Sequence, residues 1–260
     1  MEFKILTLDL LKAYTKIVGE SPLSQIDKAE KVEIPVDYFQ FYKSISSVYS
    51  SKIEGEDIDF DSYFKHKFLN VKFKPDYTRK ADDLYSAYDF IDNQKLSLEN
   101  VKKAHSILSS KLLPKSQQGL IRTNPMFVIN SDDGIEYVAS SPYVIEQELN
   151  KLFHDIDLLI EKKLNHYEIF YYASLLHLVF VKIHPFQDGN GRTARLIEKW
   201  FLIEKIGIKA TSVQLEKNYY KNLTSYYANI KKLGLEYDYL DYNQSLDFLL
   251  MTVQGISNKK

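Results

Sequence analysis

The sequence contains no cysteine, and it has only nine glycines and seven prolines in 260 residues. The absence of cysteine excludes disulfides, thiolate catalysis and cysteine-bound zinc or iron–sulfur sites. The scarcity of glycine and proline argues against a collagenous, linker-like or many-turned all-β chain. With 45% hydrophobic and 27% charged residues, the composition is that of an ordinary globular protein and favours a compact, largely helical fold.

An excess of positive charge and a long apolar segment are also lacking. The 34 Lys and Arg oppose 35 Asp and Glu, a net charge of -1, which argues against a general nucleic-acid-binding protein. The longest apolar stretch, Ala173 to Val181, is interrupted by Ser174 and His177 and is too short for a membrane helix. The amino terminus lacks the features of a secretory signal. We therefore expect no nucleic-acid partner, no membrane and a cytoplasmic location.

Apolar residues return every three or four positions along most of the sequence, which predicts helices. The first half is expected to hold a connection through Ser21 and Pro22 and helices over 5–18, 36–53, 56–68, 77–93 and 98–112. In the second half, Ser141 and Pro142 are expected to open a helix. Further helices are expected over 165–182, from just after Gly191 to Gly207, and over 217–233 and 243–253.

Residues 120–137 break the helical pattern. Residues 126–129 favour a strand, 130–134 have turn chemistry, and 135–138 can form the partner strand. A lone hairpin has little stability of its own, so it must pack on the helices or be held by a ligand. The sequence thus predicts an all-α protein, a helical bundle with one small β-hairpin.

A loop rich in functional groups, residues 184–195, joins the two most hydrophobic predicted helices. Its Gly-Asn-Gly segment, residues 189–191, lets successive backbone N–H groups turn toward one point and cradle an anion. The helix that follows adds its amino-terminal dipole there. Arg192 and Arg195 lie three positions apart, so both can reach the same anion. The loop is therefore expected to bind phosphate.

Two further side chains of the loop carry chemistry. Asp188 would repel phosphate directly, so its expected role is to hold a hard cation such as Mg²⁺ against phosphate oxygens. His184 is the nearby group that titrates near neutral pH and can act as a general base. A base, a metal ligand and a phosphate cradle are the components of a phosphoryl or nucleotidyl transfer site.

The loop closely resembles the signature of the Fic family, written H-P-F-x-D-G-N-G-R-x-x-R. All nine specified positions are matched, by His184, Pro185, Phe186, Asp188, Gly189, Asn190, Gly191, Arg192 and Arg195. The resemblance extends over roughly residues 98–235. It implies a Fic-fold core over 96–260, with a flap hairpin at about 122–138, packed as one unit with an N-terminal helical region over 1–95.

This resemblance implies an enzyme, a nucleotidyltransferase that moves AMP from ATP to a Tyr, Ser or Thr hydroxyl of a protein target. His184 would be the catalytic base, Asp188 the Mg²⁺ ligand, and Arg195 the contact to the γ-phosphate. The segment Asn222 to Tyr227 fits the family's N-x-x-x-Y-Y arrangement near the adenine. The nucleotide-binding residues expected on this basis are Asp188, Gly189, Asn190, Gly191, Arg192, Thr193, Ala194, Arg195, Tyr226 and Tyr227.

Two regulatory or binding segments are implied as well. The flap would order a target segment by strand addition, with Val128 as its clamp residue and Ile129 and Asn130 beside it. Residues 50–55 fit the family's inhibitory pattern [S/T]-x-x-x-E-[G/N], through Ser50, Glu54 and Gly55, on a helix at about 36–55. In that reading Glu54 pairs with Arg195 and denies it to ATP, so the enzyme inhibits itself.

Alternatives to this function remain at the level of sequence. The same site can serve mainly to remove AMP from a modified protein, or it can use another phosphate-linked donor. In a different class, the chain is a catalytically idle, nucleotide-dependent binding module. ATP and a protein with a modifiable hydroxyl are the expected partners, and a homodimer is one expected assembly.

Overall fold

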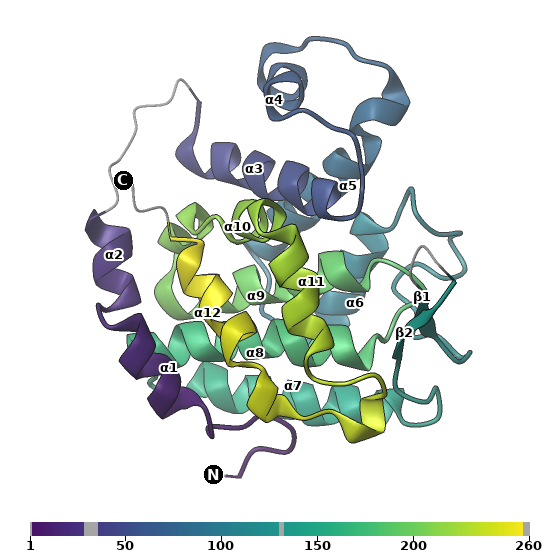
Figure 1. Cartoon of the computed structure of the whole chain (residues 1–260). Coiled ribbons are helices and arrows are strands. Elements are labelled where there is room, and N and C mark those ends of the chain that lie inside the picture. The colour runs from purple at the N-terminus through teal and green to yellow at the C-terminus, as the bar shows by residue number, and fades with distance from the viewer. Residues whose placement is uncertain (1, 29–35, 130–132, 257–260) are drawn as a thin grey trace.

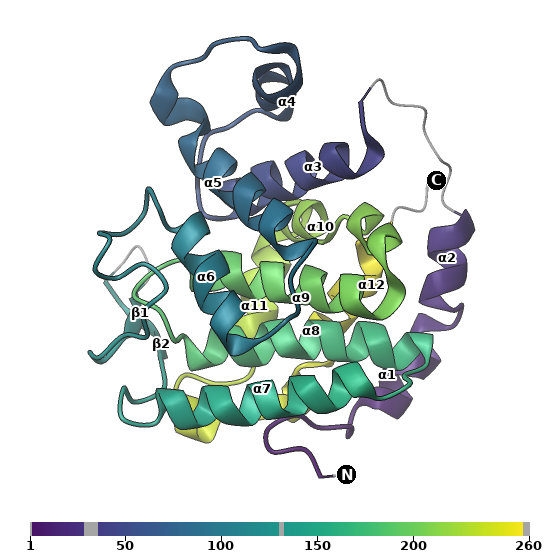
Figure 2. The same cartoon turned by 180° about the vertical axis from the view of Figure 1, so that it is seen from behind.

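The structure is a computed structural model that describes residues 2–28, 36–129 and 133–256. Two long helices, α8 (His166–Ile183) and α9 (Asn190–Ile206), lie at its centre, and α7 (Ile145–Glu161) lies beside α8 (Figures 1 and 2). Most side chains of α8 and α9 are buried, including Phe180 and Trp200. The broad apolar pattern in these two segments therefore identifies the core of the protein, as the sequence predicts.

The two ends of α8 are set by local chemistry. At its start, Asn165 and Glu168 form a capping box, each side chain accepting a backbone N–H of the other residue. At its end, His184 adopts the left-handed conformation with φ of 55°, and Pro185 follows. Because a residue that precedes proline is disfavoured in a helix, the chain leaves α8 at His184 and enters the loop.

The other helices surround this centre. They are α1 (Leu11–Val18), α2 (Pro22–Lys28), α3 (Tyr38–Ile53), α4 (Phe60–Leu69), α5 (Pro75–Ile91), α6 (Leu98–Leu108), α10 (Leu215–Lys221), α11 (Leu223–Lys231) and α12 (Leu246–Gln254). Short 3₁₀ turns lie at Ile208–Ser212, Tyr237–Tyr239 and Tyr242–Gln244. In Figure 1, α10, α11 and α12 lie in front of α8 and α9, and α3 to α5 lie above them.

Helix α3 packs on the core through buried polar contacts as well as apolar ones. The Asp37 carboxylate caps its start by accepting the N–H groups of Phe39 and Gln40. Further along, Ser46 donates to the buried carboxylate of Glu216 over 2.9 Å. Because an unpaired buried polar group is costly, the bond from Ser46 to Glu216 holds α3 against α10.

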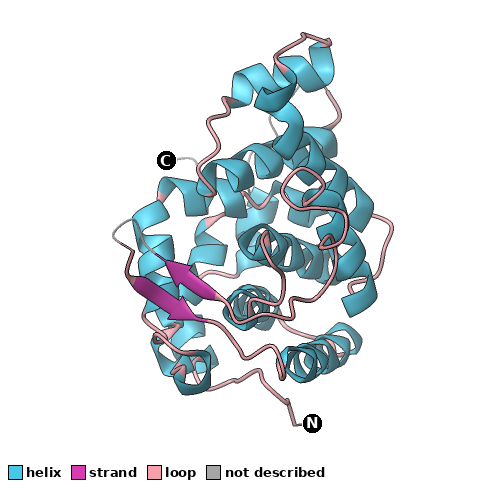
Figure 3. Ribbon diagram, turned by 90° about the vertical axis from the view of Figure 1, so that its right-hand side faces the viewer, coloured by secondary structure: helices cyan, strands magenta, loops and turns pink. Residues whose placement is uncertain are grey.

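A small two-stranded sheet lies at the end of the molecule where α8 finishes (Figure 3). Strands β1 (Phe127–Ile129) and β2 (Ile135–Val138) are antiparallel, with Phe127 opposite Val138 and an irregularity between Val128 and Ile129. The Tyr137 hydroxyl donates to the carbonyl of Lys182 over 2.6 Å. The hairpin is therefore attached to the end of α8, as its expected lack of independent stability requires.

Several predicted helix boundaries were wrong. The first helix begins at Leu11 instead of residue 5, and residues 22–28 form a helix where only a connection is predicted. Helix α7 begins at Ile145, not at Ser141, and α6 ends at Leu108. The helix predicted over 217–233 is divided at Asn222, whose φ of -115° lies outside the helical region.

The late start of α1 has a specific cause on α7. The carboxylate of Asp155, fully buried, accepts the backbone N–H groups of Lys4, Ile5 and Leu6 over 2.8 to 3.0 Å. These bonds hold residues 4–6 against α7, outside α1, which begins at Leu11. In the part of the chain that the structure describes, no helix is both long and apolar enough to cross a membrane.

Replacing Asp155 by alanine should destabilise the protein by about 2 to 4 kcal/mol, because it leaves buried N–H groups without an acceptor. Urea unfolding followed by circular dichroism measures the difference. The exposed Asp157, two residues along the same helix, provides the matched control in Asp157→Ala. Equal unfolding midpoints for the two variants would show that the contact does not anchor the amino-terminal segment.

Candidate active site

A cavity of about 280 Å³ opens between the hairpin, the end of α8, the start of α9 and helix α11. The loop contributes His184, Asp188 and residues 189–191 to its wall, and α9 contributes Arg195. Its remaining lining residues are Glu54, Val128, Glu136, Tyr137, Val181, Lys182, Tyr226, Tyr227, Ile230 and Lys231. Residues predicted from four separate sequence segments thus meet at one cavity.

The loop is held rigid by one buried phenylalanine and one asparagine. Phe186 is fully buried, and its ring stacks on that of His105 with 3.7 Å between the ring centres. The Asn190 side chain accepts the N–H of Phe186 and donates to its carbonyl, both over 2.8 Å. These paired bonds join residues 186 and 190, so Asn190 fixes the turn that is expected to bind an anion.

His105 on α6 packs against the loop, although it belongs to no sequence motif. Its Nδ1 accepts the N–H of Gly119 over 2.9 Å, so the proton lies on Nε2, which donates to the carbonyl of Asp188 over 2.9 Å. Burial lowers the pKa of this imidazole to about 4, so it stays neutral. The two bonds fix the backbone from which the Asp188 carboxylate projects.

Gly189 and Asp188 sit at the turn into α9. Gly189 has a φ of +77°, and a Cβ there would lie 3.2 Å from Leu108 and 3.3 Å from His105. Glycine is therefore required at this position. The Asp188 side chain is exposed, and one of its oxygens accepts the N–H of Gly189 over 2.6 Å. The carboxylate is thus presented at the cavity beside the amino terminus of α9.

His184 is oriented as a base that acts through its outer nitrogen. Its Nδ1 lies 3.0 Å from the carbonyl of Val181, which can only accept, so Nδ1 carries the proton and Nε2 keeps its lone pair. Burial, with help from the cation of Arg122, lowers the pKa of His184 below its ordinary value. The imidazole is therefore neutral at pH 7 and able to accept a proton.

The side chain of Arg122 joins the loop to the segment around the hairpin. It donates to the carbonyls of His184, Asn124 and Ser140 over 2.6 to 2.7 Å. The Ser140 hydroxyl in turn donates to the carbonyl of Ile183 over 2.8 Å. Three carbonyls from distant parts of the sequence are thus held by one cation, which fixes the position of His184 relative to the hairpin.

Arg195 is fully buried and is paired mainly with α3 and its C-cap residue. Its Nη2 donates to a carboxylate oxygen of Glu54 over 2.6 Å and to the carbonyl of Ser50 over 3.2 Å. Its Nε donates to the Ser50 hydroxyl over 2.9 Å, and Nη1 donates to the Tyr226 hydroxyl over 3.2 Å. The structure therefore brings Ser50 and Glu54 to the arginine that the sequence pattern pairs with them.

Glu54 is held as a carboxylate directly against the loop. Burial alone would raise its pKa, but the cations of Arg195 and Arg192 outweigh burial and lower the pKa below its ordinary value. A Cβ added to Gly191 would lie 2.8 Å from the Glu54 carboxylate and 3.2 Å from Arg195. Because Gly191 has no side chain, the Glu54 carboxylate has room to lie beside it. Gly55 follows with a φ of +87° and ends α3.

A second carboxylate of the same segment lies near the other signature arginine. The Glu56 carboxylate is 3.8 Å from Nη2 of Arg192 and also pairs with Lys80. Arg192 is nearly fully buried, and its Nε has no hydrogen-bond partner among the described residues. A buried cation with an unpaired donor is suited to receive an anion. Glu56 lies outside the inhibitory pattern, so the sequence motif could not point to it.

The predicted nucleotide-binding residues fall into two groups. Asp188, Gly189, Asn190, Gly191, Arg195, Tyr226 and Tyr227 line the cavity. Arg192, Thr193 and Ala194 do not line it. Thr193 and Ala194 are fully buried, and Thr193 donates to the carbonyl of Gly189 over 2.8 Å. The sequence spacing alone does not separate these groups, because it gives the order of residues but not the rotation of the helix.

The two tyrosines of α11 differ in exposure. Tyr226 is 1% exposed, and its ring packs against Tyr219 and Phe248. Tyr227 is 38% exposed, and its hydroxyl donates to the carbonyl of Ile53 over 3.1 Å. Tyr227 thus presents its ring at the cavity and also touches the end of α3, whereas Tyr226 reaches the cavity from inside the core.

The flap residues are also divided in their placement. Val128 lines the cavity, and Ile129 is 59% exposed on the neighbouring position of β1. Asn130 lies outside the described residues. At the other side of the cavity, Lys231 and Glu136 form an ion pair with 2.6 Å between Nζ and Oε1. Neither residue of this ion pair belongs to a motif.

The donor set at Asp188 fits a magnesium ion that accompanies a polyphosphate. Mg²⁺ is bound in such sites by one or two carboxylates, with phosphate and water oxygens completing its shell. Among residues 2–28, 36–129 and 133–256, no three His, Asp or Glu side chains gather as a metal site. The exposed carboxylate of Asp188 lies beside the amino terminus of α9.

The fold and the loop together define a helical protein in which a glycine-rich turn and a helix amino terminus lie beside a neutral histidine at one cavity. Residues 95–202 match the family model described as Fic/DOC family. A protein adenylyltransferase Fic from Nematostella vectensis is 30% identical over 105 residues, which are 40% of this chain. The matched region is 22% of that relative's length, about a fifth.

Solved structures show the same fold over nearly the whole chain. A Fic family protein from Desulfovibrio desulfuricans G20 has a TM-score of 0.74 at 15% identity, covering 98% of this chain and 74% of its own. A Fic domain containing signaling protein from Bacteroides thetaiotaomicron VPI-5482 has a TM-score of 0.62 at 18% identity, covering 95% and 92%. Fic-1 from C. elegans has a TM-score of 0.61 at 16% identity, covering 96% and 72%. The predicted fold class is confirmed.

The neutral state of His105 predicts a pH dependence of stability. Its pKa is about 4 in the folded protein and 6.5 in the unfolded chain, so the unfolded chain takes up the proton first as the pH falls. The stability that His105 contributes is complete above pH 6.5 and is lost between pH 6.5 and about 4. His105→Gln removes this titration and should flatten the dependence by about 3 kcal/mol over that range.

Urea unfolding at several pH values between 4 and 7 measures this slope. His154→Gln is the matched control, because His154 is exposed on α7 and remote from the loop in sequence. A slope that is the same in wild type, His105→Gln and His154→Gln would contradict the assignment of a neutral, structural imidazole to His105.

Proposed function

We propose that this chain is a self-inhibited protein adenylyltransferase that transfers AMP from ATP to a Tyr, Ser or Thr hydroxyl of a protein target. The observation that carries the proposal is the pairing of Glu54 with Arg195 inside the cavity that also holds His184 and the Gly-Asn-Gly turn. The name of the Nematostella vectensis relative, a protein adenylyltransferase, supports the type of transfer.

His184 is the base in this mechanism. Its Nε2 takes the proton of the target hydroxyl while that oxygen forms a bond to the α-phosphorus of ATP. The bond between the α-phosphorus and the bridging oxygen breaks at the same centre, and pyrophosphate leaves with the electron pair. The bond from Nδ1 to the Val181 carbonyl keeps the imidazole in the required tautomer during the transfer.

The loop supplies the electrostatic part of the mechanism. We assign the N–H groups at residues 189–191 to the charge that develops on the leaving pyrophosphate. Arg192, which does not line the cavity, is assigned to the same anion because its buried Nε has no partner among the described residues. Asp188 would hold Mg²⁺, which neutralises charge on the phosphate oxygens when bound. Arg195 is assigned to the γ-phosphate. In this assignment each cationic group of the loop meets one part of a polyphosphate.

Glu54 blocks the site by charge and by occupancy. Its carboxylate takes the strongest donor of Arg195 and adds a negative charge where a phosphate would lie. Because its pKa is lowered by the two arginines, the carboxylate remains ionised at neutral and mildly acidic pH. ATP is then denied the γ-phosphate contact, and its α-phosphate is not aligned with the target hydroxyl.

The hairpin offers a place for the target protein. Phe127, Ile129 and Ile135 are each about half exposed on its surface, although they are large and apolar. Val128 faces the cavity between them. An extended segment of the target that pairs with the hairpin would have its hydroxyl directed toward His184, which lies at the same cavity.

Glu54→Gly should increase labelling from ATP that carries a radioactive α-phosphate by about ten- to a hundredfold, because the blocking carboxylate is removed. Self-labelling and labelling of lysate proteins are measured on gels, and mass spectrometry identifies the added group as AMP. Adding His184→Ala should abolish the signal.

Three outcomes would contradict the proposal. Equal labelling of wild type and Glu54→Gly would refute self-inhibition by Glu54. Persistent labelling in the double variant would remove His184 from the role of base. Nucleotide-dependent thermal stabilisation of Glu54→Gly without labelling would favour an idle binding module instead of an enzyme.

Within the Glu54→Gly background, Asp188→Asn should reduce labelling by about a hundredfold and raise the Mg²⁺ concentration needed for half-maximal rate. The neutral amide keeps the shape of the side chain but loses the charge that holds a hard cation. Gln187→Ala, at the exposed neighbouring position, should leave the Mg²⁺ dependence unchanged. Identical Mg²⁺ dependence in Asp188→Asn and its parent would exclude Asp188 as the metal ligand.

A further inference from the structure

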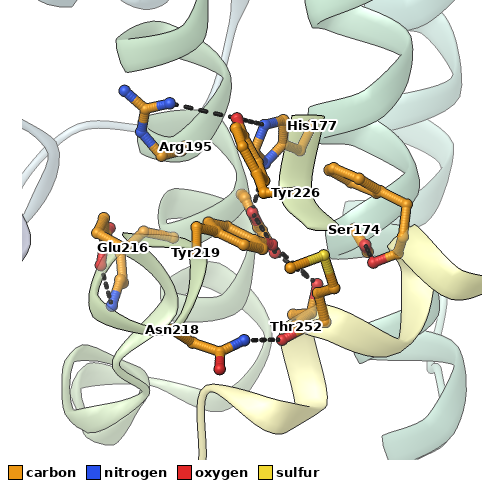
Figure 4. Close-up of polar contacts among 12 residues, drawn as sticks. Ser174, His177, Arg195, Glu216, Asn218, Tyr219, Tyr226 and Thr252 are labelled. Carbon is orange, nitrogen blue, oxygen red and sulfur yellow. Dashed lines mark hydrogen bonds and ion pairs between the residues drawn. The ribbon is translucent and has the colours of Figure 1, made fainter. Parts of the chain in front are cut away.

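Behind the cavity, four buried side chains are linked in series by three hydrogen bonds. The first and the last of these residues both lie on α9. We call Arg195, Tyr226, His177 and Glu198 the Arg195 network. Nη1 of Arg195 lies 3.2 Å from the Tyr226 hydroxyl, which lies 3.0 Å from Nε2 of His177. Nδ1 of His177 lies 2.7 Å from the Glu198 carboxylate. Figure 4 shows Arg195, Tyr226 and His177 in this order, and all four residues are at most 1% exposed.

The carboxylate of Glu198 sets the direction of every bond in the Arg195 network. It also receives the hydroxyls of Tyr219 over 2.8 and 2.9 Å and of Thr252 over 2.6 Å, so its neighbours all act as donors. His177 must therefore donate from Nδ1, which leaves Nε2 as an acceptor. Burial, and to a smaller degree Arg195, lowers the pKa of His177, consistent with a neutral imidazole.

This tautomer orients the Tyr226 hydroxyl. Because Nε2 of His177 accepts, the hydroxyl proton of Tyr226 points to His177 and its oxygen lone pairs point to Arg195. Burial raises the pKa of Tyr226, so the phenol keeps this proton. The Tyr226 oxygen is thus oriented to accept a hydrogen bond from Arg195.

The contact from Tyr226 is independent of the inhibitory residue. Of the four hydrogen bonds that described residues make to the Arg195 guanidinium, three come from Ser50 and Glu54 and one comes from Tyr226. When a nucleotide takes the place of Glu54, the bond to Tyr226 does not have to break. A guanidinium fixed at one nitrogen can then present its other N–H groups to an anion in one orientation.

We infer that Tyr226, His177 and Glu198 are positioning residues that aim Arg195 at the terminal phosphate of the nucleotide. This inference rests on the proposed function, in which Arg195 binds the γ-phosphate. It gives Tyr226 a role through its hydroxyl, in addition to any contact that its ring makes with the base. The three residues favour a triphosphate over a diphosphate because only the triphosphate reaches the oriented arginine.

Nucleotide affinity in the Glu54→Gly background tests this inference. Isothermal titration calorimetry with Mg²⁺ and either ATP or ADP gives the ratio of the two affinities. Tyr226→Phe removes only the hydroxyl and should weaken ATP binding about tenfold, with ADP binding unchanged, so the ratio falls about tenfold. Glu198→Gln should lower the ratio similarly, because its amide can donate to Nδ1 and reverse the tautomer of His177.

Tyr219→Phe is the matched control. It is the same chemical change at a fully buried tyrosine that bonds to Glu198 but makes no hydrogen bond to Arg195 among the described contacts. We expect it to leave the ratio of ATP to ADP affinity unchanged. Thermal unfolding of each variant separates loss of folding from loss of orientation, because a merely structural effect weakens both nucleotides equally.

The inference is overturned if Tyr226→Phe keeps the affinity ratio of its parent, or if it weakens ATP and ADP alike. It is also overturned if Glu54→Gly itself does not prefer ATP to ADP, because Arg195 would then not bind the terminal phosphate. Failure of the proposed function has a different signature, which is absence of AMP transfer. The affinity ratio does not depend on transfer, so the two failures are distinguishable.

Discussion

A fully buried guanidinium is the constraint on which the site depends. An arginine removed from water must have its charge compensated and its N–H groups paired, or the fold loses several kcal/mol. Arg195 meets this requirement with a carboxylate from outside the core and a phenol from inside it. Through its contacts with Ser50, Glu54 and Tyr226, this one side chain joins α3 and α11 to α9 at the wall of the cavity.

The backbone of the loop before α9 is also held by a small number of side chains. His105, Asn190 and Arg122 bind main-chain groups of residues 184–190 and leave the side chains of His184 and Asp188 facing the cavity. Support from these three residues would preorganise the proposed base and anion cradle without using the groups that are proposed to react. Arg122 also binds carbonyls on both sides of the hairpin, so the hairpin and His184 are held in fixed positions relative to one another.

The sequence predicts the core and the loop well because both are local patterns. The apolar periodicity of 165–182 and the nine signature positions depend only on neighbours along the chain. The structure places the helix as expected and brings six of the signature residues to the cavity, although Arg192 does not line it. The pairing of Glu54 with Arg195 was also accessible, through a resemblance between motifs. By contrast, some features of the structure cannot be read from periodicity. They are the bonds from Asp155 to residues 4–6, the stacking of His105 on Phe186 and the break at Asn222. Tyr226 illustrates the limit, since its motif indicates a place near the cavity but not that its hydroxyl turns inward.

Glu54 stands at the very end of a helix that is fastened elsewhere. Ser46, two turns earlier, holds α3 to Glu216, and Lys43 pairs with Asp89 over 2.9 Å. The Glu54 side chain itself is 27% exposed and is followed by a glycine in a left-handed conformation. Under the proposed self-inhibition, moving this one carboxylate into solvent would free Arg195 for a nucleotide at the expense of a single ion pair, while the contacts of Ser46 and Lys43 keep α3 in place without any domain movement.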